Sequence, residues 1–260
     1  ARDTDFDLKL ISCLNRVRAH MRMSAQPPHE FLELGHLLDE MRLFKDRDEL
    51  KLMQRAADIS IEAHRAAMRA AKPGIHEYEL QAEIECVFRR HDAEPAYGSI
   101  VGAGDNACVL HYRANNAQAK DGALVLIDAG AEYRGYAADI TRTFPVNGRF
   151  SKEQRALHDL VGDAQRAAQA QAQPGVPYEA GHRAAVETLT EGLLKLGLLK
   201  GGLEKNVAEG TYKRFYRHKT GHWLGLDVHD VGEYRFDGDS RLLEPGMVFT
   251  IEPGLYVSVD

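Results

Sequence analysis

Hydrophobic positions recur with the period of an α-helix in two parts of the chain, and the two parts resemble each other. A sequence typical of a capping box at 46–49 precedes a predicted helix that ends at Lys72-Pro73-Gly74, and a second helix is predicted at 77–91. The same order recurs from 151–154, where a helix continues to Pro174-Gly175 and another follows. The weak repeat predicts two similar α+β halves whose sheets meet around one cleft, with chance as the alternative because this order is common.

Short apolar or β-branched runs bounded by Gly, Asn or Asp predict the strands of this fold. The runs lie at 97–103, 107–113, 123–129, 136–144, 247–251 and 255–259. The third and fourth runs are expected to form a β-hairpin that turns at 132–135. The glycine pattern at 102–107 leads into a strand and not into a helix, so it predicts a hairpin turn and not a nucleotide-binding loop. The basic and aromatic segment 213–219 is interpreted as a strand with a solvated face.

Composition limits the class of protein. The chain has 260 residues with a net charge of −6, 44% hydrophobic residues and 28% charged residues, which excludes disorder. No apolar run approaches the roughly 20 residues of a membrane span, and the mild acidity argues against nucleic-acid binding. The three cysteines form no CxxC pair, so they indicate neither a disulfide framework nor a thiolate zinc site. A reducing cytoplasm is the simplest interpretation.

The N-terminal region differs in character from the rest of the chain. Residues 5–18 have the apolar spacing of a helix, and 26–45, which begins with two prolines, are expected to be an extended connection. The first residue is not Met, and the last predicted strand is cut by the end of the sequence at Asp260. We therefore expect the sequence to be a piece of a longer protein.

Three acidic residues stand on predicted apolar strands, where an uncompensated carboxylate costs on the order of several kcal/mol. Asp128 ends the run LVLI, Asp139 lies 11 residues later on the other strand of the hairpin, and Glu252 follows the run at 247–251. Each alone is more typical of a hairpin or edge residue. Together they indicate a site for a cation.

Histidines add further candidate ligands. His222 and His229 lie seven residues apart, His218 precedes the first by four, and glycines among them permit close approach of the backbone. Carboxylate oxygens with one imidazole suit Mn²⁺, Co²⁺, Fe²⁺ or Zn²⁺, and several carboxylates able to bridge favour a site with two ions. The histidines on predicted helices have no acidic companions on strands and are interpreted as packing or solvent-facing residues. They are His64, His91, His158 and His182.

Four motifs carry a resemblance to a known family. The segments LVLIDAG, GYAADITRTFPVNG, HWLGLDVHDVG and LEPGMVFTIEPGLY resemble those of the pita-bread metallopeptidases, and most closely the X-Pro aminopeptidases. EMRLFKDRDEL resembles the entry into that family's catalytic domain. The resemblance covers residues 38–260 and implies the α+β pita-bread fold, with two similar halves whose antiparallel sheets, backed by helices, surround a central metal site. It also implies that 1–37 are the remnant of an N-terminal domain plus a linker.

The resemblance implies a dinuclear metal site, commonly with manganese. The family's Asp, Asp, His and Glu ligands match Asp128, Asp139, His222 and Glu252. A fifth ligand, a glutamate, is expected beyond Asp260, so residues 38–260 are expected to be a C-terminally incomplete catalytic domain.

The resemblance also implies a mechanism and a substrate. A metal-bridging water is the nucleophile, Glu252 relays its proton, His229 donates to the tetrahedral intermediate, and His111 and His218 flank the substrate. The implied enzyme removes the N-terminal residue from peptides with proline in second position. It is expected to be a cytoplasmic homo-oligomer that binds neither nucleic acid nor membranes. Two alternatives stay open: a prolidase acting on X-Pro dipeptides, and a non-catalytic pita-bread module that binds histones or peptides.

Overall fold

The computed structural model describes residues 3–20, 26, 28 and 30–258, which divide into two compact units, 1–38 and 39–260. In the first unit, helix α1 (Thr4–Ala19) confirms the helix expected at 5–18, and its N-cap Asp3 accepts hydrogen bonds from the amides of Asp5 and Phe6. Among the described residues, no helix has both the length and the apolar character to cross a bilayer.

The prediction of an extended connection at 26–45 is wrong in its second half, because Leu34–Leu43 forms helix α2. Leu34, Leu38 and Met41 follow the spacing i, i+4, i+7 of a helical stripe. The two prolines precede this stripe by several residues, so they impose no extended backbone on it.

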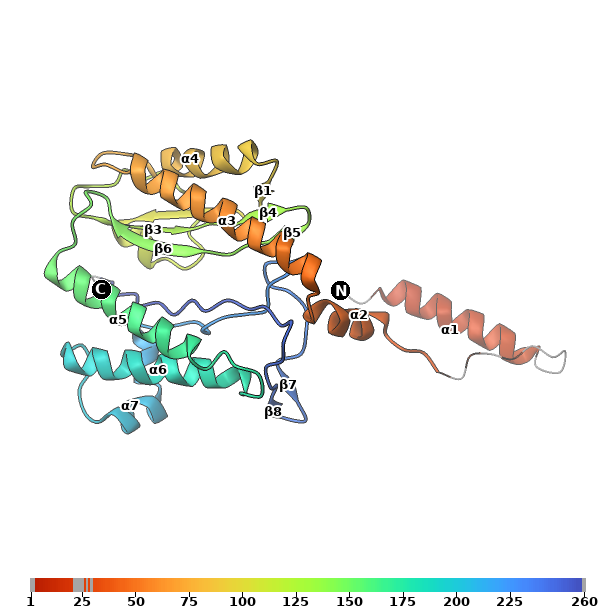
Figure 1. Ribbon diagram of the computed structural model, residues 1–260. Helices are drawn as coiled ribbons and strands as arrows, with labels where there is room; N and C mark the ends of the chain where they lie inside the picture. Colours follow the sequence, from red (N-terminus) through yellow and green to blue (C-terminus); the bar gives the residue numbers. More distant parts are fainter. Residues whose placement is uncertain (1–2, 21–25, 27, 29, 259–260) are drawn as a thin grey trace. The chain divides into compact units, whose positions relative to one another are not determined.

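The first half of the larger unit packs two helices against short antiparallel sheets, and Figure 1 shows these helices on the face away from α5 and α6. The helices are α3 (Arg47–Ala70) and α4 (Glu77–Arg90), both as predicted, and α3 begins with the expected capping box of Asp46 and Glu49. One sheet has the order β2-β3-β6, from Ile100–Ala103, Leu124–Asp128 and Thr141–Pro145. The other has the order β1-β4-β5, from Glu94–Pro95, Ala131–Tyr133 and Tyr136–Ala137.

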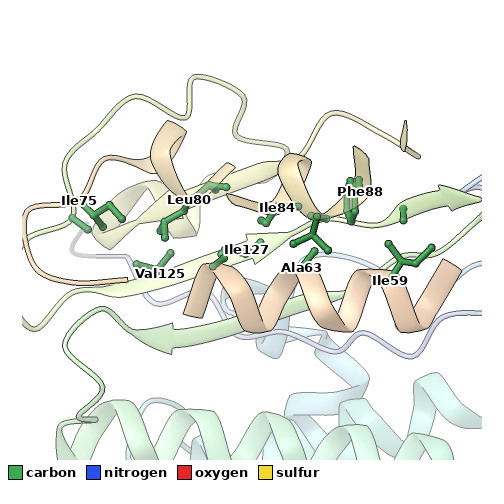
Figure 2. Packing of buried hydrophobic residues seen from close by; sticks show 14 of the residues in the cluster. Ile59, Ala63, Ile75, Leu80, Ile84, Phe88, Val125 and Ile127 are labelled. Carbon is green, nitrogen blue, oxygen red and sulfur yellow. The ribbon is translucent and has the colours of Figure 1, made fainter. Parts of the chain in front are cut away.

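The hydrophobic core of this half lies between the two helices and the sheets. Figure 2 shows Ile59 and Ala63 of α3 facing Ile84 and Phe88 of α4, with Ile127 of β3 beside Ala63. All five side chains are fully buried. Burial of an aliphatic or aromatic side chain contributes about 1.5–3 kcal/mol, so this core gives the strand that ends at the first candidate aspartate a rigid support.

The second half repeats the helical order but has little regular sheet. Its helices are α5 (Lys152–Gln169), α6 (Tyr178–Lys195) and α7 (Leu203–Glu209), and its short hairpin is formed by β7 (Arg235–Phe236) and β8 (Asp239–Ser240). The segment predicted as a strand at 247–251 forms only the isolated bridges of Met247 with Phe44 and Phe249 with Trp223. Residues 255–258 form no strand, and the rest of the strand expected at 255–259 lies outside the described residues.

Two further strand predictions are wrong. The segment at 107–113 instead begins in the 3-10 helix η2 (Gly104–Cys108) and continues as a turn, in which His111 has a left-handed φ of 55°. At 213–219 the chain leaves the 3-10 helix η3 (Thr211–Arg214) and continues without regular structure. There the buried aromatics Tyr212, Phe215 and Tyr216 follow a helical spacing and not the alternation of a strand.

Candidate metal centre

The register of one β-hairpin explains why two aspartates 11 residues apart lie together. Asp128 of β3 is opposite Thr141 of β6, and the pairing of β4 with β5 continues the same register. Asp139 therefore falls opposite Gly130. Because side chains alternate between the two faces of a strand, Asp128 and Asp139 project from the same face as diagonal neighbours.

Tyr97 is a site residue that the sequence analysis missed. Its hydroxyl lies 2.5 Å from Oδ1 of Asp128 and 2.8 Å from Oδ1 of Asp139, and it comes from the segment between β1 and β2. Burial and the two carboxylates raise the pKa of Tyr97, so the phenol stays protonated. Periodicity alone gives no signal for this residue, since it precedes β2 and reaches the aspartates only through the pairing of β2 with β3.

His222 and Glu252 complete the cluster from the second half of the fold. His222 Nε2 lies 3.1 Å from Oδ2 of Asp139 and 3.2 Å from Oε1 of Glu252. One ligand atom from each of these three residues lies within 4.8 Å of the others, as required of a shared metal site. Asp128 joins them through Tyr97 and through its charge interaction with Asp139. The structure thus brings all four predicted ligands together.

A close backbone approach holds the segments of His222 and Glu252 side by side. Thr250 donates its amide to the His222 carbonyl at 2.9 Å, and its hydroxyl accepts the His222 amide at 3.0 Å. The same hydroxyl lies 2.8 Å from Oε1 of Glu252. A Cβ on Gly221 would stand 1.9 Å from the Thr250 carbonyl oxygen, so only glycine fits before His222.

The electrostatics are those of crowded carboxylates partly neutralised by protons. Burial and the charge of Asp139 raise the pKa of Asp128 to about 7. Although burial opposes it, hydrogen bonds from His222 and Tyr97 hold the pKa of Asp139 below its usual range. Burial also disfavours the His222 imidazolium, but its hydrogen bonds to Asp139 and Glu252 outweigh this and raise its pKa to about 10. Without an ion, His222 is therefore positively charged at neutral pH.

A proton on His222 competes with a metal ion for the same nitrogen, so we expect binding of a divalent ion at pH 7 to release more than one proton. His222 loses its proton, and Asp128, with a pKa of about 7, loses a fraction of one. Affinity should rise with pH until about 10, where His222 is deprotonated in the free protein. Calorimetric titration in buffers of different ionisation enthalpy counts the protons. Release of none at pH 7 contradicts this assignment of charge.

The predicted catalytic histidines line the same cleft of about 1420 Å³ as the four candidate ligands. The His229 ring stands edge-on to His222, with ring centroids 4.1 Å apart, and burial followed by the charge of His222 lowers the pKa of His229. His218 Nε2 lies 3.0 Å from the Tyr256 hydroxyl. His111 is exposed and reaches the cleft from the turn after η2. The three histidines thus line the same cleft as the cluster of carboxylates.

Glu77 holds the loop that carries His111. Its side chain is fully buried at the start of α4, and its two oxygens accept four hydrogen bonds from that loop, at 2.8–3.0 Å. The donors are the amides of Ala103 and Ala117, the Asn106 side chain and the Tyr112 hydroxyl. Because Glu77 lies far from the loop in sequence, local patterns could not reveal that 107–113 is bound in this way.

We expect Glu77→Gln to lower the free energy of unfolding by about 1–3 kcal/mol, because the new amide group faces donors and leaves at least one of them unpaired. Urea denaturation measures the loss, and hydrogen exchange should accelerate across 103–117. Glu83→Gln, at an exposed position on the same helix, is the control and should be close to neutral. Equal stability of the two variants would contradict the anchoring role of Glu77.

A cluster of carboxylates and one imidazole that could hold a metal ion is the kind of site that metallopeptidases contain. The chain belongs to metallopeptidase family M24, whose family model matches residues 51–260. Membership implies divalent metal ions. The α+β pita-bread fold predicted from the sequence is confirmed by this match and by the solved structures that resemble the chain.

Curated relatives at high identity carry one name. The Xaa-Pro aminopeptidase of Escherichia coli K12 is 45% identical over 98% of this chain and 58% of its own length. That of Haemophilus influenzae is 48% identical over 89% of this chain and 54% of its own length. The chain thus spans little more than half of the relatives it matches.

Two solved structures are similar over almost the whole chain. Pseudomonas aeruginosa aminopeptidase PepP is 52% identical, with a TM-score of 0.94 over 100% of this chain and 59% of that one. Zinc-substituted E. coli aminopeptidase P in complex with product is 45% identical, with a TM-score of 0.90 over 98% of this chain and 58% of that one. These values describe a common fold and not only a common core.

Proposed function

We propose that the protein is a metal-dependent aminopeptidase that removes the N-terminal residue from peptides with proline in second position. The observation that carries the proposal is the convergence of Asp128, Asp139, His222 and Glu252 in one cleft. The relatives named Xaa-Pro aminopeptidase, at 45% and 48% identity, support the choice of substrate. Residues 38–260 would then be the catalytic domain of a longer homo-oligomeric protein.

The four proposed ligands fit divalent ions in their chemistry. They offer carboxylate oxygens and one imidazole nitrogen, a donor set that suits Mn²⁺ and also Co²⁺, Fe²⁺ or Zn²⁺. Burial and then the charge of Asp139 raise the pKa of Asp128, and a bound cation would offset both effects. We propose two ions, with Mn²⁺ as the native metal and a fifth ligand, a glutamate, from beyond Asp260. The zinc-substituted E. coli relative supports metal exchange at such a site.

The surrounding residues have distinct roles in peptide hydrolysis. Bound divalent ions supply Lewis acidity, which polarises the scissile carbonyl and makes an attacking water more acidic. Glu252 takes the proton of the attacking water and passes it to the leaving amine. His229 stays neutral at pH 7 because its pKa is lowered, yet its one N–H still donates to the carbonyl oxygen as negative charge develops there. His111 and His218 hold the substrate from two sides of the cleft.

The selectivity for proline tests this proposal. Proline presents a tertiary amide with fixed φ and no N–H, so a pocket shaped for the ring can hold a scissile bond that most peptidases do not accept. We expect the intact protein, supplied with Mn²⁺, to cleave dipeptides and tripeptides with proline in second position and to leave the matched alanine peptides intact. Release of the first residue is measured by chromatography.

Three other outcomes of this peptide assay would each overturn the proposed activity. Equal turnover of the alanine series indicates a broad aminopeptidase. Cleavage of dipeptides alone indicates a prolidase. No cleavage by protein that demonstrably holds metal indicates a binding module.

A further inference from the structure

The hairpin that carries both aspartates is interrupted between them. Residues 129–130 and 138–140 lie in the register of the flanking strands, yet they belong to neither sheet. Ala131 is the first residue of β4, but it pairs with Pro95 of β1 and is not part of the β4–β5 ladder. In this interval the Ala129 amide donates to the Ile140 carbonyl at 3.1 Å, and the Ala138 amide donates to the Ala131 carbonyl at 2.9 Å. In a regular antiparallel ladder, each hydrogen-bonded pair of facing residues makes two such bonds, whereas Ala129 with Ile140 and Ala131 with Ala138 make one each. The Ala129 carbonyl and the Ala131 amide are therefore left without a backbone partner on the facing strand, and they bond to other groups.

Two side chains of α3 bond these groups. Ser60 Oγ accepts the Ala131 amide at 2.9 Å while donating its own proton to the Ala56 carbonyl at 2.8 Å. His64 Nε2 lies 3.0 Å from the Ala129 carbonyl oxygen. Ser60 and His64 are 0% and 3% exposed, so neither contact is exchanged with solvent. They lie four residues apart on one face of the helix, which matches the spacing of the two groups they bind.

The tautomer of His64 follows from its surroundings. A carbonyl oxygen accepts, so Nε2 must carry the proton and donate. Nδ1 is buried and has no hydrogen-bond partner among the described residues, so it is the unprotonated nitrogen. Burial lowers the pKa of His64, in agreement with a neutral ring that acts as a fixed donor. His64, interpreted from the sequence as a packing or solvent-facing residue, is thus a buried polar residue with a specific target.

The backbone at Ala138 lies very close to the backbone at Gly130. A Cβ on Gly130 would lie 1.7 Å from the Ala138 carbonyl oxygen, so the two backbones approach more closely here than a side chain permits. Asp139 follows Ala138 and lies opposite Gly130 in the register. Because Gly130 has no side chain, the face on which the Asp139 carboxylate lies is unobstructed there. The position of Asp139 relative to Asp128 is therefore set by where α3 holds residues 129–131.

We propose that Ser60 and His64 are positioning residues for the metal centre, which fix from behind the spacing of the two aspartate ligands. The inference rests on the proposed metal site. The hydrogen bonds of both side chains go to backbone groups and to none of the four proposed ligands. Both act through the backbone that joins the two ligands. Partners in the outer shell of a metal site typically change its affinity by about 10–100-fold when they are replaced.

A pair of amide variants at position 64 separates positioning from packing. In His64→Gln the amide nitrogen is as many bonds from Cα as Nε2 of the histidine, so it can still donate to the Ala129 carbonyl. In His64→Asn the amide is one bond shorter and falls short of it. Ser60→Ala removes the acceptor of the Ala131 amide and provides an independent test. Leu80→Ala, in the fully buried core at α4, is the control for general loss of stability.

The measurement is the dissociation constant for Mn²⁺, by calorimetric titration of the ion-free intact protein. We expect His64→Asn and Ser60→Ala to weaken binding by about tenfold or more, while His64→Gln and Leu80→Ala stay near the wild type. Wild-type affinity in both His64→Asn and Ser60→Ala, with binding lost in Asp139→Asn, would overturn the inference and leave the metal site standing. Equal weakening in Leu80→Ala would also overturn it. Absence of Mn²⁺ binding by the wild type would instead overturn the proposed function, and the inference with it.

Discussion

Asp139→Asn is expected to reduce cleavage of X-Pro peptides by at least about a thousandfold, because it removes a charged ligand at the centre of the cluster. The Asp139 carboxylate contacts both the Tyr97 hydroxyl and His222. A bound ion contributes several kcal/mol of stabilisation to the transition state, and each 1.36 kcal/mol corresponds to a factor of about ten in rate. The neutral amide keeps the size of the side chain, so the loss reflects charge and ligation and not packing.

The measurement is kcat/KM together with the metal content of the purified variant. Asp58→Asn, at an exposed position on α3, is the matched control and should retain activity and metal. Circular dichroism shows whether both variants fold. Full activity in Asp139→Asn would refute its proposed role as a ligand.

Removal of the metal is expected to lower the thermal stability of the protein by about 5–10 °C. An ion present at 100 times its dissociation constant stabilises the native state by about 2.7 kcal/mol, and for a chain of this size each kcal/mol shifts Tm by roughly 2–4 °C. In the ion-free protein, three carboxylates face one another with only protons to offset their charge. The measurement is Tm before and after chelation, with elemental analysis of both samples.

Addition of Mn²⁺ to the chelated protein should restore the original Tm. The Asp139→Asn variant serves as the control, since its Tm should respond little to the chelator. An unchanged or higher Tm in wild-type protein that has demonstrably lost its metal would contradict a stabilising ion in this cluster.

The hairpin and its ligands were predictable from the sequence because a charge on an apolar strand is a conspicuous local signal. Asp128 and Asp139 interrupt hydrophobic runs, and strand alternation then places them on one face. Glu252 was found in the same way, although its segment forms only isolated bridges. His222 was one of several candidate imidazoles, and the resemblance to the metallopeptidases singled it out as a ligand. A costly residue in an apolar context is visible even where the secondary structure is irregular.

The supporting residues were not predictable because their partners are distant in sequence. Tyr97 resembles any aromatic residue at the start of a predicted strand, and only the assembled hairpin shows that it bridges two carboxylates. Glu77 resembles an ordinary acidic residue in a first helical turn, yet it binds a loop up to 40 residues away. His64 has no acidic companion on a strand and was therefore interpreted as a packing or solvent-facing residue, although its ring bonds the hairpin backbone. The local sequence pattern predicts whether a side chain is buried. The partner to which that side chain hydrogen-bonds depends on tertiary contacts that the pattern does not reveal.

The most direct test of the proposed metal centre is a crystal structure of the intact protein grown with Mn²⁺, with anomalous diffraction used to locate the ions. We expect two neighbouring anomalous peaks in the cleft, with Asp128, Asp139, His222 and Glu252 as their ligands. Peaks elsewhere on the protein, or an empty cluster in crystals whose protein demonstrably binds Mn²⁺, would contradict it.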